Sequence, residues 1–113
     1  MVTKRKVRVP IFDYDITVLV FDEWEDLKGY IPNDLLSKPS RGMTLEYEWC
    51  CTVCITPKYL STLSHESLHI VNMIWKSIDY TPQRDNDEVS AYLLTYVLEQ
   101  LTKVLNKHLT QKC

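Results

Sequence analysis

One short motif, H-E-x-x-H, constrains this chain more than any other feature of its sequence. It is His65-Glu66-Ser67-Leu68-His69, inside a stretch whose apolar residues recur at helical spacing. Residues four apart on a helix lie on the same face, so His65 and His69 can bind one metal ion. Glu66 points in a different direction and is left free to take a proton from a metal-bound water. The motif therefore predicts a helix that carries a metal site and a general base.

A third metal ligand is expected from another segment, and Glu88 is the candidate. Residues 70–87 separate it from His69, and it lies at the start of a second helical pattern. Acidic residues also favour a first helical turn for electrostatic reasons alone, and Asp87 is the alternative ligand. Two histidines and one carboxylate would hold one Zn²⁺ per chain and leave a fourth position for water. Other divalent metals accept the same ligands.

The motif and the residues around it resemble a known group of metallopeptidases. H-E-x-x-H followed by a glutamate on the next helix is the signature of the gluzincins, and the gap to Glu88 matches their aminopeptidase N-like branch. The chain is more closely similar to small zincin-like proteins encoded by tailed phages. That similarity lies in residues 63–72 (LSHESLHIVN), in Asn86-Asp87-Glu88 and in Ala91-Tyr92-Leu93, so it covers about the C-terminal half of the chain.

The resemblance implies a zinc-dependent metallopeptidase that acts on a peptide or protein substrate. Zinc would be held by His65, His69 and Glu88, and Glu66 would be the general base that activates the bound water. The alternative is a non-catalytic phage accessory protein that binds a protein partner. In that case a structural or degenerate zinc site would help a small domain to fold. Glu66 favours catalysis, because a purely structural site has no use for that carboxylate.

Four further residues are candidates for supporting the site. Tyr92 and Tyr96 follow Glu88 by one and two helical turns, where they could hydrogen-bond a ligand carboxylate or help to polarise a carbonyl. Asn72 shares the histidine face of the motif helix, and Asp87 precedes Glu88. Ordinary packing is the competing interpretation for Asn72 and the favoured one for the tyrosines.

The hydrophobic pattern predicts an α+β fold in a single domain, residues 1–113. Strands are expected at 6–10 and 16–21, with a turn at 13–15 between them. A short helix capped by Asp22 should follow over 23–30, and the clearest strand, by its alternation, is 43–56. The motif helix should begin at Thr56-Pro57, or alternatively at Ser61 or Ser64, and run to about 78. The last helix should cover 87–107.

These elements predict a minimal zincin-like core, in which a small, mostly antiparallel sheet packs on the H-E-x-x-H helix and a long C-terminal helix. The histidines should face a cleft between the sheet and the last helix. Strand 43–56, at a sheet edge, would hold an extended peptide by main-chain hydrogen bonds, or would simply be a sheet strand. Each long helix should bury one apolar stripe in the core. The expected stripes are Leu68, Val71 and Trp75 on the motif helix, and Leu94, Leu98, Leu101 and Leu105 on the last helix.

Composition excludes several classes of function. A net charge of -2 over 113 residues gives no electrostatic basis for binding nucleic acid or an anionic membrane. No apolar run approaches the roughly 18 residues that a membrane span needs, and the N-terminus does not read as a signal peptide. Four cysteines, at 50, 51, 54 and 113, are too few and too clustered for a secreted disulfide framework, so a cytoplasmic location is expected. Cys51 and Cys54 would point to opposite faces of a strand, which disfavours a shared metal.

Overall fold

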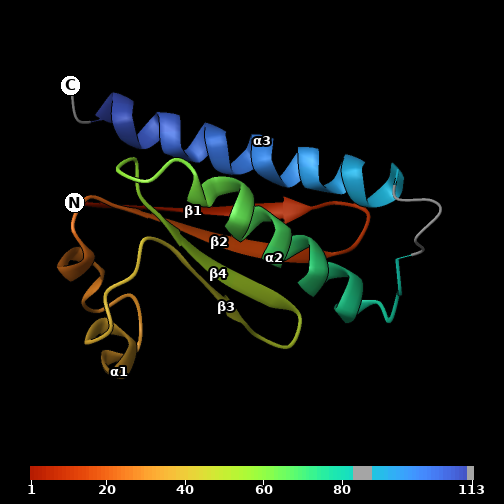
Figure 1. Ribbon diagram of the computed structural model, residues 1–113, viewed down its shortest axis with the longest axis horizontal. Coiled ribbons are helices and arrows are strands. Elements are labelled where there is room, and N and C mark those ends of the chain that lie inside the picture. The colour runs from red at the N-terminus through yellow and green to blue at the C-terminus, as the bar shows by residue number, and fades with distance from the viewer. Residues whose placement is uncertain (83–87, 112–113) are drawn as a thin grey trace.

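A four-stranded sheet with two long helices on one of its faces makes up most of this α+β chain (Figure 1). The computed structural model describes residues 1–82 and 88–111. The strands are β1 (Val2–Val9), β2 (Tyr14–Phe21), β3 (Met43–Glu46) and β4 (Cys50–Ile55). The helices are η1 (Trp24–Leu27, a 3₁₀ helix), α1 (Asn33–Leu36), α2 (Thr62–Ser77) and α3 (Glu88–Gln111). The strand order is β1-β2-β4-β3.

The sheet is mixed, and its centre is the parallel pair of β2 and β4. The outer pairs, β1 with β2 and β3 with β4, are antiparallel. Ile16 pairs with Cys51, and Val18 pairs with Val53. All four side chains are buried on the same face of the sheet. The expectation of a mostly antiparallel sheet therefore holds for the two outer pairs and is wrong for the central one.

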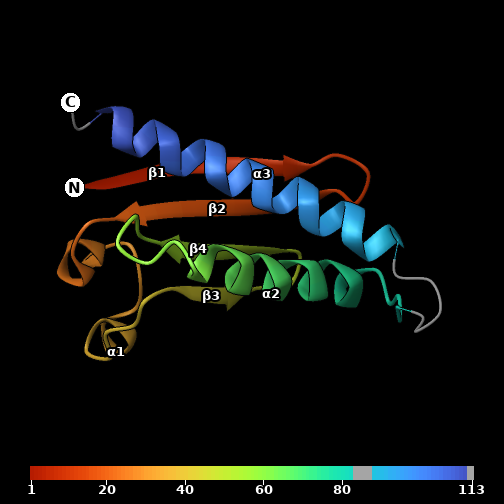
Figure 2. The same cartoon turned by 45° about the horizontal axis from the view of Figure 1, so that its top comes forward.

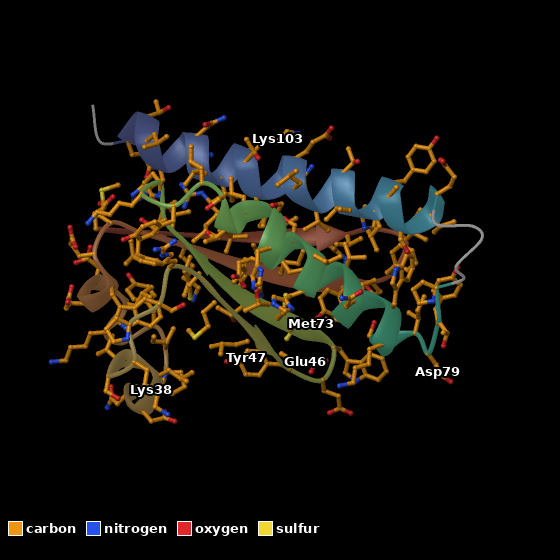
Figure 3. The ribbon with its side chains drawn as sticks, in the orientation of Figure 1. Lys38, Glu46, Tyr47, Met73, Asp79 and Lys103 are labelled. Carbon is orange, nitrogen blue, oxygen red and sulfur yellow. The ribbon has the colours of Figure 1, made fainter. Side chains whose placement is uncertain are left out.

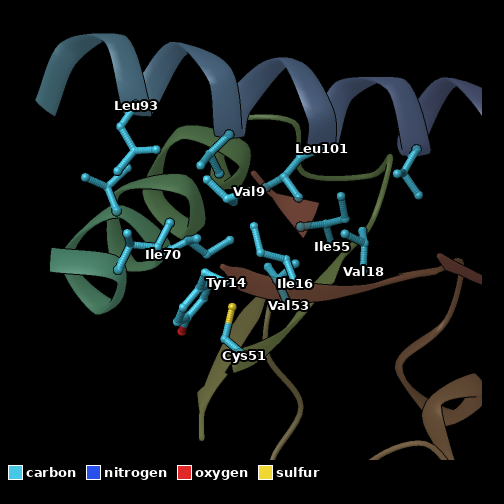
Figure 4. Packing of buried hydrophobic residues seen from close by; sticks show 14 of the residues in the cluster. Val9, Tyr14, Ile16, Val18, Cys51, Val53, Ile55, Ile70, Leu93 and Leu101 are labelled. Atoms are coloured by element: carbon cyan, nitrogen blue, oxygen red, sulfur yellow. The ribbon is translucent and has the colours of Figure 1, made fainter. Parts of the chain in front are cut away.

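Both long helices cover that apolar face. Figure 2 shows α3 over β1 and β2, and α2 over β3 and β4. Buried side chains of both helices belong to the same core, which Figure 4 shows between the helices and the sheet. The helical members of the core are Ile70, Val71, Ile74 and Trp75 of α2, and Leu93, Val97, Leu101, Val104 and Leu105 of α3.

The predicted stripes on the helices are partly wrong. Val71 and Trp75 are buried as expected, but Leu68 is 51% exposed. On α3 the stripe is rotated by about one residue toward Leu93 and Val97, so that Leu94 and Leu98 are only partly buried. A helix that packs on a sheet and on a second helix at once buries a wider arc than one stripe, and periodicity alone does not fix the centre of that arc.

The opposite face of the sheet is covered at one end by η1 and α1. Leu19, Phe21 and Cys54 pack there against Trp24 and Leu27. The expected helix over 23–30 is wrong in extent, since only Trp24–Leu27 is helical and the turn is 3₁₀. Its N-cap residue is Glu23 rather than Asp22. Gly29 then adopts a positive φ of 88°, which favours glycine and ends the turn.

The single strand predicted for 43–56 is two strands, β3 and β4, folded as a hairpin. The Tyr47 amide donates to the Cys50 carbonyl at 2.9 Å and closes the turn. A straight strand of fourteen residues would span about 46 Å, longer than the 42 Å greatest extent of the molecule. Alternation does not reveal the reversal, because the apolar and polar positions keep their order through the turn.

The first strand, expected at 6–10, is Val2–Val9 and so begins four residues earlier and excludes Pro10, and the last helix runs to Gln111 instead of 107. Two further boundaries agree with the sequence. The turn between the first two strands is confirmed, and Asp13 lies in it with a positive φ of 52°. The motif helix begins at Thr62 after Ser61, which was the second of the three predicted starts, and ends at Ser77. Pro57 and Lys58 lie in a turn before it. Within the described residues, no helix is both long enough and apolar enough to cross a membrane.

Two thiols are buried on opposite faces of the sheet. Cys51 lies in the core under α2 and α3, whereas Cys54 lies in the cluster under η1. The opposite placement expected for this C-x-x-C pair is confirmed. Burial raises the pKa of each thiol from 9.0 to about 12. Burial also raises the pKa of the neighbouring Tyr14 phenol well above its usual range.

These pKa shifts predict a loss of stability at alkaline pH. The unfolded thiols lose their protons near pH 9, while the folded ones keep them until about pH 12. The unfolded state therefore binds fewer protons in this window, and the free energy of unfolding should fall as the pH rises above 9. The slope is at most about 1.4 kcal/mol per pH unit for each group. Urea unfolding at pH 8, 9 and 10 measures it. Cys54→Val, which removes one titrating thiol, should show a shallower fall; an identical slope would contradict this explanation.

Candidate functional site

The two histidines of the motif meet on the solvent-facing side of α2. The Nε2 atoms of His65 and His69 lie 3.1 Å apart, with the rings edge to face at a centroid distance of 4.7 Å. Two imidazole nitrogens bound to one tetrahedral zinc at 2.0–2.1 Å would lie about 3.3 Å apart. The pair thus has nearly the spacing that a shared metal ion requires, and its chemistry fits zinc.

Glu66 is a buried carboxylate beside this pair. Its side chain is only 5% exposed, and Oε2 lies 4.0 Å from His65 Nε2. The Thr44 hydroxyl, on β3, donates to Oε1 at 2.6 Å. That hydrogen bond comes from the strand against which α2 packs, so the sheet fixes the orientation of the carboxylate. The other oxygen, Oε2, lies on the side of His65, with which Glu66 lines a cavity.

A cavity of about 390 Å³ opens over Glu66 and His65. The other residues that line it are Ser40, Arg41, Gly42, Ser61 and Thr62. Gly42 passes close to the carboxylate, since a Cβ there would lie 3.3 Å from Glu66 Oε2 and 3.3 Å from Thr62 Oγ1. A side chain at position 42 would crowd the Glu66 carboxylate, and glycine avoids this contact where the loop forms the wall of the cavity.

This placement corrects the expected cleft. The histidines were expected to face a space between the sheet and the last helix, but the cavity lies between α2 and the loop before β3. The physical reason is the packing of α2. Its α3-facing and sheet-facing positions are filled by Val71, Ile74 and Trp75, which leaves the histidines on the outward face.

Glu88 is not brought to the histidine pair. It is the first residue of α3, and the Trp75 Nε1–Ser90 Oγ hydrogen bond of 3.0 Å holds that end of α3 against the end of α2. Ser77, the last residue of α2, is about 12 Å beyond His69 along the helix axis. Among residues 1–82 and 88–111, no group of three or more His, Cys, Asp or Glu side chains is placed to hold a metal ion.

The predicted supporting residues lie elsewhere or are exposed. Tyr92 is 72% exposed and, with Tyr96, lines an apolar cavity between the β1–β2 turn and α3. The Tyr96 hydroxyl donates to the Arg8 carbonyl at 3.3 Å. Tyr96 thus has the packing role that the sequence favoured, whereas Tyr92 is too exposed to pack at the helix interface. Asn72 is exposed on α2, and Asp87 lies outside the described residues.

Comparison of the chain with protein-family models, with curated proteins and with solved structures gives no match.

His108, for which the sequence indicates no role, lies in a buried polar cluster. The His108 ring is fully buried on α3, with Nδ1 hydrogen-bonded to Thr3 Oγ1 at 2.6 Å. Nε2 donates to Asp22 Oδ1 at 3.0 Å. The order of hydroxyl, imidazole and carboxylate resembles a nucleophilic triad. Thr3 is only 3% exposed, however, so no substrate reaches its hydroxyl, and the cluster fastens α3 to β1.

A helical-spacing signal for this cluster was present in the sequence. His108 continues the stripe of Leu101 and Leu105 by three residues, which predicts burial. By contrast, the sequence carried no signal for Thr44 or Arg41, because their place at the site depends on the path of a loop and a short strand.

Replacement of Thr3 tests the structural role of the cluster. Thr3→Val keeps the shape but leaves the buried Nδ1 of His108 without its partner, which should lower the free energy of unfolding by about 1–3 kcal/mol. Thr3→Ser keeps the hydroxyl and should lose clearly less. Urea unfolding of both variants at pH 7 measures the difference. Equal losses in the two would show that the methyl group, not the hydrogen bond, contributes the stability.

Proposed function

We propose that this protein is a zinc-dependent hydrolase of peptide bonds, with a zincin-like arrangement around α2. His65 and His69 would hold the metal ion, and Glu66 would be the general base. The observation that carries the proposal is that a pair of histidines and a buried carboxylate lie together on about one turn of α2. The histidine Nε2 atoms lie 3.1 Å apart, and a buried carboxylate lies 4.0 Å from one of them.

Glu66 is suited to move a proton at this place. Zinc, when bound, supplies a Lewis acid and lowers the pKa of its water. The Thr44 hydroxyl holds Oε1, which leaves Oε2 on the side of the histidines and Gly42. That oxygen can accept a proton from water and return it to the leaving amine. Burial keeps competing water away from the carboxylate, whose side chain is 5% exposed.

The free edge of β3 supports a peptide as the substrate. β3 is the last strand in the order β1-β2-β4-β3, and its paired side faces β4. An extended peptide can add to such an edge by main-chain hydrogen bonds. The cavity at Glu66 lies at the start of β3, and a second one of about 460 Å³ lies at its end. Tyr47, Trp49 and Met73 line this second cavity, and Figure 3 shows Tyr47 and Met73 on facing elements.

A third protein ligand would complete the metal site. Resemblance to gluzincins implies Glu88, which would have to move toward the pair from the far end of α2. Otherwise the histidines would hold the ion with water completing its coordination. The alternative function, a partner-binding protein with a degenerate zinc site, is favoured by one observation: among the described residues, no group of three or more His, Cys, Asp or Glu side chains is placed to hold a metal ion.

Zinc content and the Glu66→Gln variant test the proposal. The parent protein should bind about one zinc per chain, and His65→Ala should lose it. Glu66→Gln should keep the zinc but lower kcat on a peptide substrate by a hundredfold or more, since general-base catalysis contributes roughly 10²–10⁴-fold. Elemental analysis and an assay with a quenched-fluorescence peptide mixture measure both.

Three outcomes of that experiment are informative. Zinc in the parent with no peptide cleavage would favour the partner-binding alternative. A Glu66→Gln variant that keeps its rate would remove Glu66 as the base. Glu88→Gln belongs in the same series, because weaker zinc binding in that variant would show that α3 reaches the pair when the metal is bound.

Thr44 should act as a positioning residue for the base. Thr44→Val removes the donor to Glu66 Oε1 and should lower kcat by roughly tenfold, on the basis of about 1.5 kcal/mol for a hydrogen bond to a charged group. KM and zinc content should stay near those of the parent, because neither the β3 backbone nor the histidines change. Thr44→Ser should restore kcat. An increase in KM with unchanged kcat would show that Thr44 contacts the substrate instead.

A further inference from the structure

The positively charged side chain of Arg41 lies at the cavity that contains Glu66. Arg41 lines that cavity together with His65 and Glu66. It belongs to the loop that leads directly into β3, the strand proposed to pair with an extended peptide. A peptide that follows the β3 edge to its start therefore arrives at the Arg41 side chain.

The guanidinium of Arg41 is held by an aromatic ring and not by a carboxylate. It lies over the Tyr59 ring, 5.0 Å from the ring centroid. In the described part of the chain, ion pairs engage Arg8, Lys58 and Lys76, and none engages Arg41. A cation over a ring face gains attraction while its N–H donors, at the edge of the guanidinium plane, stay available.

Other exposed cations of the described residues, such as Lys38, also lie outside the ion pairs, so charge alone does not distinguish Arg41. Lys38, in the same loop, is also exposed and lines no described cavity near the histidines. Figure 3 shows Lys38 beside α1, away from α2. Arg41 differs in two respects, its place in the wall of the cavity with Glu66 and its support by Tyr59. These two differences suit Arg41 to binding a ligand at the site, whereas an ordinary exposed cation only keeps the protein soluble.

We propose that Arg41 determines substrate specificity by binding a carboxylate of the peptide, which rests on the proposed peptidase function. The planar guanidinium offers two parallel N–H donors that match the two oxygens of a carboxylate. That carboxylate is either an acidic side chain or the C-terminus of the peptide. The Glu66 carboxylate would repel a second negative charge placed beside it, so the bound group should lie on the side of Arg41 away from Glu66.

Peptide binding to the zinc-loaded Glu66→Gln protein tests this proposal without cleavage. The probes are extended heptapeptides of Val and Thr with one Glu moved through every position, and matched peptides with Gln. Each is made with a free C-terminal carboxylate and with a C-terminal amide. Isothermal titration calorimetry compares their affinities for Glu66→Gln alone and combined with Arg41→Gln, Arg41→Lys or, as the matched control, Lys38→Gln.

The expected result is about a tenfold preference for the peptide that carries the recognised carboxylate. Arg41→Gln should reduce the preference to about onefold, Arg41→Lys should keep part of it, and Lys38→Gln should keep it fully. A preference that follows Glu identifies an acidic side chain, and one that follows the free C-terminus identifies the terminal carboxylate. No preference, or one that survives Arg41→Gln, overturns the proposal, as does the absence of any peptide binding.

The two proposals fail in distinguishable ways. A parent protein that cleaves peptides while its Glu66→Gln variant binds them with no acidic preference would keep the hydrolase proposal and overturn the role of Arg41. A parent protein that cleaves no peptide, together with a preference for the carboxylate that requires Arg41, would overturn the hydrolase proposal and keep Arg41 as the carboxylate-binding residue. Circular dichroism and thermal unfolding of each variant ensure that a lost preference does not reflect a lost fold.

Discussion

The parallel pairing of β2 with β4 is the constraint on which the rest of this structure depends. It aligns Val18 with Val53, both fully buried, and gives the sheet one continuous apolar face. Because β4 leads into α2, that face also fixes where the motif helix lies. α2 then crosses the hairpin so that Glu66 meets Thr44 of β3, and Lys76 meets Glu46 at 3.3 Å. The arrangement of the site thus follows from the packing of α2 on the β3–β4 hairpin.

The burial of Glu66 is the feature least explained by folding alone. A carboxylate taken out of water loses hydration, and the one hydrogen bond from Thr44 does not use all of its acceptor capacity. A Cβ at position 42 would lie only 3.3 Å from Oε2, so Gly42 leaves room beside the carboxylate. Buried ionisable groups in a cavity, beside residues able to bind metal, are typical of sites selected for chemistry and not for stability. The histidine pair beside it is the reason that we propose hydrolysis.

The sequence predicted the α+β class, the first hairpin, both long helices and the helical placement of the motif, since each rests on local periodicity or turn chemistry. It did not predict the break between β3 and β4, because alternation continues through Tyr47 and Trp49. Nor did it predict the outward direction of His65, which depends on which arc of α2 the sheet and α3 fill. Thr44 and Arg41 carried no signal, because a short strand and a loop bring them to Glu66 only after the sheet has formed.

Stability and the candidate site are divided between different parts of the chain. α3 contributes buried side chains and the His108 cluster to the core, whereas the cavity at Glu66 is lined by residues 40–42, by Ser61 and by the first turns of α2. A site built this way can change its specificity through the loop without disturbing the core. Arg41 occupies that position: its ring contact with Tyr59 lies outside both hydrophobic clusters, so its side chain can serve recognition at little cost to the fold.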